Sequence, residues 1–145
     1  MDFTLSRYKD LCLALLDSGY TPLTVYSYLV LEGKKNKNNN NNKLVVLRHD
    51  IDRKFGNALR MAELEHELGI QSTYYFRFPY TFKPEIIGKI NDWGHEIGYH
   101  YEVLSKAKGD YEKAIKVFVW APGLKDCLRD QCISPCGEWR DRRDA

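Results

Sequence analysis

The sequence lacks an uninterrupted apolar stretch long enough to cross a bilayer, although 43% of its 145 residues are hydrophobic. Residues 1–30 also lack the layout of a secretory signal, because charged residues such as Asp2, Arg7 and Asp17 interrupt the apolar ones. Charge of one sign is not in excess, since 22 Lys and Arg residues against 20 Asp and Glu residues leave a net charge of only +2. These absences predict a cytoplasmic protein with no membrane and no nucleic-acid partner.

Cysteine is scarce and unevenly placed. Cys12 stands alone, whereas Cys127, Cys132 and Cys136 lie near the end of the chain. This is not the spread framework of a small secreted protein, so we expect free thiols. The three late cysteines, at spacings of five and four residues, lack the fourth ligand that a structural zinc knuckle requires.

The apolar pattern divides the chain into four segments. Residues 1–32 are predicted to be an N-terminal helical segment. Residues 33–43 contain four lysines, six asparagines and no apolar side chain, which predicts a flexible loop. A solvated insertion is the simpler interpretation of this loop, and binding of an acidic polymer is the alternative. Residues 44–118 have a regular pattern, and residues 119–145 form an irregular tail with three cysteines and two tryptophans.

Within the first segment, residues 3–17 carry apolar side chains at helical spacing and are followed by Gly19, which predicts an amphipathic helix. Residues 24–32 fit either a strand or a helix.

The regular segment alternates strands with helices. The predicted elements are strands at 44–47, 72–76 and 95–100, a helix at 54–68 closed by Gly69, a helix from Pro84 to Trp93, and a helix at 110–118. The run at 44–47 is apolar throughout, as in strands that are buried on both faces. This order predicts an α/β fold with a βαβαβ unit and a parallel sheet, in which ligands bind at the carboxyl ends of the strands.

Polar residues crowd directly after the first predicted strand. By alternation Asp50 and Asp52 point the same way, and His49 lies beside them. Two carboxylates and an imidazole can bind a divalent metal, or one carboxylate can remain free as a general base. The alternative interpretation is a structural ion-pair cluster with Arg48 and Arg53.

Two histidines bracket the third predicted strand. His95 and His100 would point to opposite faces, and His100 lies at the carboxyl end beside Tyr101 and Glu102, which makes it the better ligand candidate. We expect His95 to be a hydrogen-bonded core or surface histidine. We expect His66, in the middle of a helix with charged neighbours, to face solvent.

The stretches VVLRHDIDR, STYYFR and GHEIGYHYE resemble the polysaccharide deacetylase family, also called the NodB-homology or carbohydrate esterase family 4 group. The likeness covers residues 44–118 and is closest to the branch with an HDxD first motif. It implies an incomplete (β/α) barrel and a metal-dependent hydrolase, usually using zinc. Such enzymes remove N-acetyl or similar acyl groups from sugars or attack other non-peptide C–N bonds.

The resemblance also implies roles for individual residues. Asp50 matches the general base, Asp52 the metal-binding aspartate, and His100 the first histidine of the second motif. The family's second metal-binding histidine normally follows four positions later, where this chain has Leu104. His49 or Glu102 would then be needed to complete the ligands of the divalent metal.

Arg48 and Arg77 are the candidate substrate-binding residues, and the expected partner is a carbohydrate or a small N-acyl substrate.

The family's general acid is a later histidine, and no histidine follows His100 in this chain. We therefore expect the family's remaining strands and helices to be absent, with residues 119–145 a truncated, frameshifted or unrelated end.

Two functions remain open: an active hydrolase, or a truncated and inactive form of the fold with at most weak metal binding. A half-built parallel sheet would also expose an apolar edge, which favours formation of a homo-oligomer.

Overall fold

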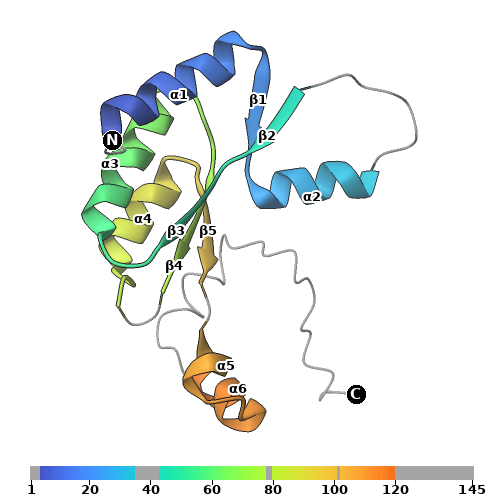
Figure 1. Cartoon of the computed structure of the whole chain (residues 1–145), viewed down its shortest axis with the longest axis vertical. Coiled ribbons are helices and arrows are strands. Elements are labelled where there is room, and N and C mark those ends of the chain that lie inside the picture. Colours follow the sequence, from blue (N-terminus) through green and yellow to red (C-terminus); the bar gives the residue numbers. More distant parts are fainter. Residues whose placement is uncertain (1–3, 35–42, 78–79, 101, 120–145) are drawn as a thin grey trace.

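A computed structural model describes residues 4–34, 43–77, 80–100 and 102–119 (Figure 1). The elements in chain order are α1 (Leu5–Asp17), β1 (Tyr20–Leu23), α2 (Val25–Lys34), β2 (Lys43–Val46), β3 (Arg48–Ile51), α3 (Phe55–Glu67), β4 (Thr73–Phe76), α4 (Pro84–Asp92), β5 (Glu96–Tyr99), α5 (Val103–Lys106) and α6 (Tyr111–Val119). The fold is mixed α/β with two small parallel sheets, and the described residues form no closed barrel. Among these residues, no helix combines the length and the apolar character that crossing a membrane requires.

The first helix confirms the prediction for residues 3–17. The Thr4 hydroxyl caps α1 by accepting a hydrogen bond from the Arg7 amide, at 3.3 Å. Tyr8 and Cys12, one turn apart, are its buried residues, and Gly19 ends the turn with a φ of +76°. The short strand β1 that follows was not predicted. Among the described residues it pairs with β2 and no other strand, which is the edge position that a strand containing proline tolerates.

The undecided segment after Pro22 is the helix α2. Its first amide groups bond to side chains from distant strands: Val25 N–H donates to Thr73 Oγ1 at 2.8 Å and Tyr26 N–H donates to Glu96 Oε2 at 2.9 Å. These bonds satisfy donors that every helix leaves free at its first turn. Most of the predicted flexible loop, residues 35–42, lies outside the described residues.

One extended segment supplies a strand to both sheets, as Figure 1 shows for β2 and β3. Leu47 links them, since its N–H donates to Leu23 O at 3.2 Å and its carbonyl accepts from Thr73 N–H at 3.0 Å. The prediction of a buried strand at 44–47 is wrong in two respects. Strand β2 is only partly covered, and within the described part of the chain it pairs with β1 and no second strand. The polar residues 48–51 themselves form strand β3.

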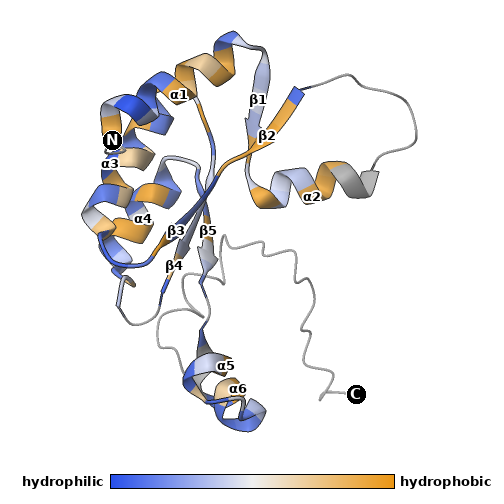
Figure 2. Ribbon diagram, in the orientation of Figure 1, coloured by the Kyte–Doolittle hydropathy of each residue, from blue (hydrophilic) through white to orange (hydrophobic). Residues whose placement is uncertain are grey.

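A βαβαβ unit is present as β3-α3-β4-α4-β5, with the parallel strand order β3-β4-β5, but its first strand is residues 48–51 and not the predicted 44–47. Figure 1 shows α3 and α4 side by side against this sheet. Figure 2 shows apolar and hydrophilic residues alternating along both helices, as expected of helices with one buried face. The buried core of this layer consists of Ile51, Ala58, Ala62, Tyr74, Phe76, Ile87 and Ile90.

The last described elements are α5 and α6. The latter confirms the helix predicted for residues 110–118, and its first turn is capped by Asp110, whose Oδ1 accepts from Lys113 N–H at 3.0 Å. The four-residue helix α5 was not predicted. The late cysteines and the predicted irregular tail beyond residue 119 lie outside the described residues.

Candidate functional site

The two faces of the β3-β4-β5 sheet differ in character. His49, Ile51, Tyr74 and Phe76 lie on the face that packs against the helices, and the last three belong to the core. Because successive strand residues point to opposite faces, Arg48, Asp50, Tyr75 and Gly98 lie on the other one. We call this second face, together with Asp52, Arg77 and His100 at the carboxyl ends of its strands, the polar face.

Asp50 lies where the two resemblance motifs meet on the polar face. Arg48 donates two hydrogen bonds to its carboxylate, from Nε to Oδ1 at 2.9 Å and from a terminal nitrogen to Oδ2 at 3.2 Å. The Nε2 atom of His100 lies 3.8 Å from Oδ2. Strands β3 and β5 are not neighbours, because β4 lies between them. The fold therefore brings together Asp50 and His100, which belong to separate motifs of the sequence.

Arg77 pairs with the carboxylates of Asp52 and Glu102, the other two predicted site residues that carry a carboxylate. One terminal nitrogen lies 3.4 Å from Asp52 Oδ1, and the other donates to Glu102 Oε2. The bond with Glu102 raises the pKa of Arg77, and the same bond lowers the pKa of Glu102, which Lys106 also approaches at 3.5 Å. The predicted ion-pair cluster thus exists in altered form: Arg48 pairs with Asp50, whereas the partner of Asp52 comes from the end of β4.

His49 lies on the opposite face from Asp50 and Asp52. Its side chain is only 13% exposed, and its Nε2 is 2.7 Å from Glu65 Oε1. The prediction that His49 could complete a metal site with Asp52 is therefore wrong in this structure, because strand alternation directs the imidazole toward the helices.

The buried carboxylate of Glu65 is a polar centre that was not predicted from the sequence. Oε1 accepts hydrogen bonds from Tyr8 and His49, and Oε2 accepts from Ser72 at 2.6 Å and from Tyr74 at 2.7 Å. These five residues, which we call the Glu65 cluster, tie α1, α3, β3 and β4 together. The available signal was a glutamate within the apolar helical spacing of residues 58–68.

The charge of Glu65 is stabilised although the side chain is fully buried. Burial acts to raise its pKa, but the hydrogen bond and charge of His49, with the bonds from Ser72 and Tyr8, outweigh burial and lower it. Burial beside this carboxylate raises the pKa of both Tyr8 and Tyr74. The cluster is therefore an ionised carboxylate surrounded by neutral phenols.

The predictions for the other two histidines are confirmed. His95 is a core histidine, since its Nε2 lies 3.0 Å from Ala62 O and its Nδ1 accepts from Ser72 N–H at 3.3 Å. Burial lowers the pKa of His95, which favours the neutral ring. His66 is exposed on α3 and stacks on Trp93, with ring centroids 6.0 Å apart.

The donors for a divalent metal are incomplete. Asp50 and His100 approach each other, but Asp52 and Glu102 are paired with Arg77 and His49 faces away. Within residues 4–34, 43–77, 80–100 and 102–119, no three His, Cys, Asp or Glu side chains lie close enough to hold a metal ion. As arranged, these residues do not make up the zinc centre that the resemblance implies, which needs three protein ligands.

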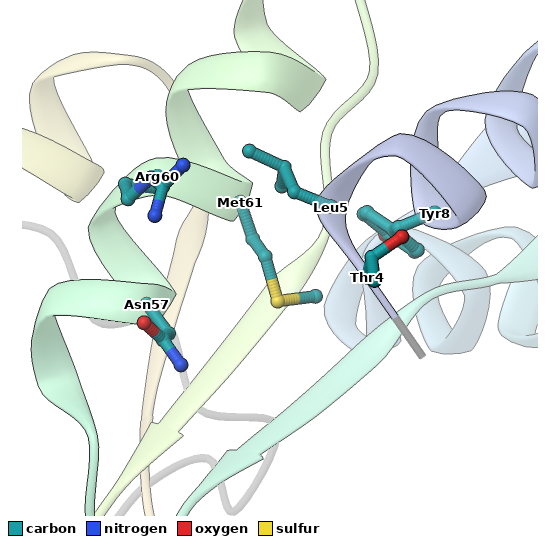
Figure 3. A pocket seen from close by; sticks show the side chains of 6 residues that line it. All are labelled: Thr4, Leu5, Tyr8, Asn57, Arg60 and Met61. Atoms are coloured by element: carbon teal, nitrogen blue, oxygen red, sulfur yellow. The ribbon is translucent and has the colours of Figure 1, made fainter. Parts of the chain in front are cut away.

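A groove of about 250 Å³ lies between α1 and α3 (Figure 3). Its lining consists of Thr4, Leu5, Tyr8, Asn57, Arg60 and Met61. None of the predicted site residues lines it, and only Tyr8 connects it to the Glu65 cluster. The predicted chemistry therefore belongs to the polar face rather than to this groove.

No family model, curated protein or solved structure matches this chain. The likeness to the polysaccharide deacetylases therefore depends on the motifs around Asp50 and His100.

Proposed function

We propose that the polar face is the reaction site of a polysaccharide deacetylase-like hydrolase that acts on N-acyl groups of carbohydrates. One observation carries the proposal: Asp50 of the HDxD motif and His100 of the second motif come within 3.8 Å of each other across an intervening strand. The carboxyl ends of parallel strands are also the usual position of ligands in such sheets.

Asp50 is the proton acceptor in this proposal. Its side chain is 41% exposed, so water can reach the carboxylate, and the two bonds from Arg48 fix the orientation of its oxygens. The carboxylate takes a proton from a water molecule as the water oxygen attacks the acyl carbonyl carbon, and the carbonyl π electrons move onto the carbonyl oxygen. When this tetrahedral intermediate collapses, the C=O bond re-forms, the C–N bond breaks, and protonated Asp50 returns the proton to the leaving amine. His100 Nε2 lies 3.8 Å from Asp50 Oδ2, so in this proposal the imidazole contacts an acyl group that is held at Asp50. No step is assigned to a metal ion, because the donors for one are incomplete.

An acetyl-release assay on acetylated chitooligosaccharides tests the proposal, with zinc added in one arm and a chelator in the other. The wild-type chain should release acetate, and Asp50→Asn, which keeps the size but loses the base, should lower the rate by about 10²–10⁴-fold. The matched control is Asp92→Asn, an exposed aspartate at the end of α4, which should retain full activity. Absence of acetate release by the wild-type chain, or full activity in Asp50→Asn, would overturn the proposal.

A second candidate function is that of a catalytically inactive relative of the fold with at most weak metal binding. Arg77 favours this candidate, because it pairs with both Asp52 and Glu102, and Leu104 stands where the family has its second histidine. Elemental analysis of the purified protein then shows no stoichiometric zinc, cobalt or nickel. One equivalent of bound zinc together with acetate release would exclude this candidate.

A further inference from the structure

Gly98 in the middle of β5 makes room for an aromatic ring. It is the register partner of Tyr75 on β4. A Cβ atom at Gly98 would lie 2.5 Å from Cε1 and 2.6 Å from Cδ1 of Tyr75, much closer than carbon atoms can pack. Gly98 is not among the glycines with positive φ, so the requirement is for the missing side chain and not for a special backbone conformation.

The ring of Tyr75 in turn supports Arg48. The guanidinium carbon of Arg48 lies 4.5 Å from the ring centroid, within the range of a cation–π contact. The same guanidinium donates the two hydrogen bonds to the Asp50 carboxylate. The Arg48 side chain is 53% exposed, and an exposed ion pair alone holds its geometry poorly because ordering two side chains costs entropy. Stacking on a fixed ring restrains the guanidinium.

We propose that Gly98 and Tyr75 are positioning residues that hold Arg48 in the orientation from which it directs the Asp50 carboxylate toward His100. The contacts form a continuous series from β5 through β4 to β3. The absence of a side chain at Gly98 leaves space for the Tyr75 ring, the ring makes a cation–π contact with Arg48, and Arg48 donates two hydrogen bonds to Asp50. This inference rests on the proposed function, since there Asp50 is the reacting base.

The first test is Gly98→Ala, with Gly88→Ala as matched control. A Cβ at Gly88 on α4 meets nothing within 4 Å, so the control adds the same methyl group without displacing a neighbour. In ¹⁵N-labelled protein we follow the Nε–H signal of Arg48, assigned through its loss in Arg48→Lys. The chemical shift of this signal depends both on the Tyr75 ring next to the guanidinium and on the hydrogen bond from Nε to Asp50. It should move in Gly98→Ala and stay in place in Gly88→Ala.

The second test removes atoms instead of adding them and so decides the question even if Gly98→Ala does not fold. Tyr75→Phe keeps the ring and should retain the Arg48 signal, whereas Tyr75→Leu should shift it. In the acetyl-release assay, Tyr75→Leu should lower kcat by about tenfold or more with KM little changed, because the base is displaced while substrate contacts persist. Tyr75→Phe should have near wild-type kcat.

The outcomes separate this inference from the proposed function. If the Arg48 signal shifts in Tyr75→Leu but the wild-type chain releases no acetate, the positioning holds and the proposed function fails. If the wild-type chain is active and folded Tyr75→Leu leaves both the Arg48 signal and kcat unchanged, the positioning inference is wrong and the proposed function stands. Equal decreases of kcat in Tyr75→Phe and Tyr75→Leu would also refute the positioning inference, because Tyr75→Phe keeps the aromatic ring.

Discussion

Replacing Glu65 by glutamine should destabilise the protein strongly, although the side chain keeps its size. The carboxylate accepts four hydrogen bonds, two at each oxygen, from donors on α1, β3 and β4 and from Ser72. Glutamine supplies one acceptor oxygen in place of two, so two of these donors face an amide N–H₂ group instead. A buried donor that loses its acceptor costs about 1–3 kcal/mol. Because hydroxyl groups can turn and accept from the amide, we expect a total of about 2–4 kcal/mol.

Urea unfolding followed by circular dichroism at pH 7 measures this loss as the change in the free energy of unfolding. The matched control is Glu63→Gln, an exposed glutamate on the same helix, which should change the free energy by no more than about 0.5 kcal/mol. A second variant, Tyr8→Phe, removes one of the donors. The effects of Tyr8→Phe and Glu65→Gln should not add in the double variant, since both act on one hydrogen-bond network.

The pH dependence gives an independent check on the same carboxylate. The folded pKa of Glu65 lies below its ordinary value of 4.5, so its contribution to stability is present above pH 4.5 and is lost as the pH falls through the folded pKa. The stability difference between wild type and Glu65→Gln should therefore shrink in acid. Two results would show that Glu65 is not a buried, ionised carboxylate that stabilises the fold. One is a decrease in the free energy of unfolding of less than about 1 kcal/mol at pH 7, and the other is a difference between wild type and Glu65→Gln that grows in acid.

Three further predictions concern the rest of the fold. Burial lowers the pKa of His95 from 6.5, so the free energy of unfolding should begin to fall as the pH drops below 6.5, and His95→Gln should remove this part of the slope in a comparison of unfolding at pH 7.5 and pH 5.5. Ile90→Ala, in a fully buried core position, should cost about 2–5 kcal/mol in urea unfolding, and a loss below 1 kcal/mol would contradict the assigned core. Gly69→Ala should cost about 1–2 kcal/mol by thermal unfolding because φ is +69°, whereas Gly56→Ala, with open space in α3, should be neutral or slightly stabilising.

The layered part of the fold could be predicted because its signals are local. The helix over α3 follows from apolar spacing and from Gly69, and the strand at 73–76 follows from aromatic and β-branched residues. Such periodicities depend on the backbone repeat alone. The parallel β3-β4-β5 order then follows from the alternation of strands with helices.

Other elements depended on distant partners. Residues 24–32 fitted a strand or a helix until Glu96 and Thr73, far along the chain, supplied acceptors for the first turn of α2. The boundary between β2 and β3 is likewise set by pairing, since Leu47 bonds to Leu23 on one side and to Thr73 on the other. No local pattern encodes these contacts.

At the candidate site, the sequence by itself determined which residue types follow the first predicted strand. The structure showed that residues 48–51 are themselves a strand, whose alternation places His49 and Asp50 on opposite faces. Only the tertiary structure decided which partner each side chain has: Arg48 and His100 for Asp50, Arg77 for Asp52 and Glu102, and Glu65 for His49. The physical reason is that hydrogen bonds and ion pairs form within a few ångströms in space, and all of these partners except Arg48 lie far along the chain from the residue that they contact.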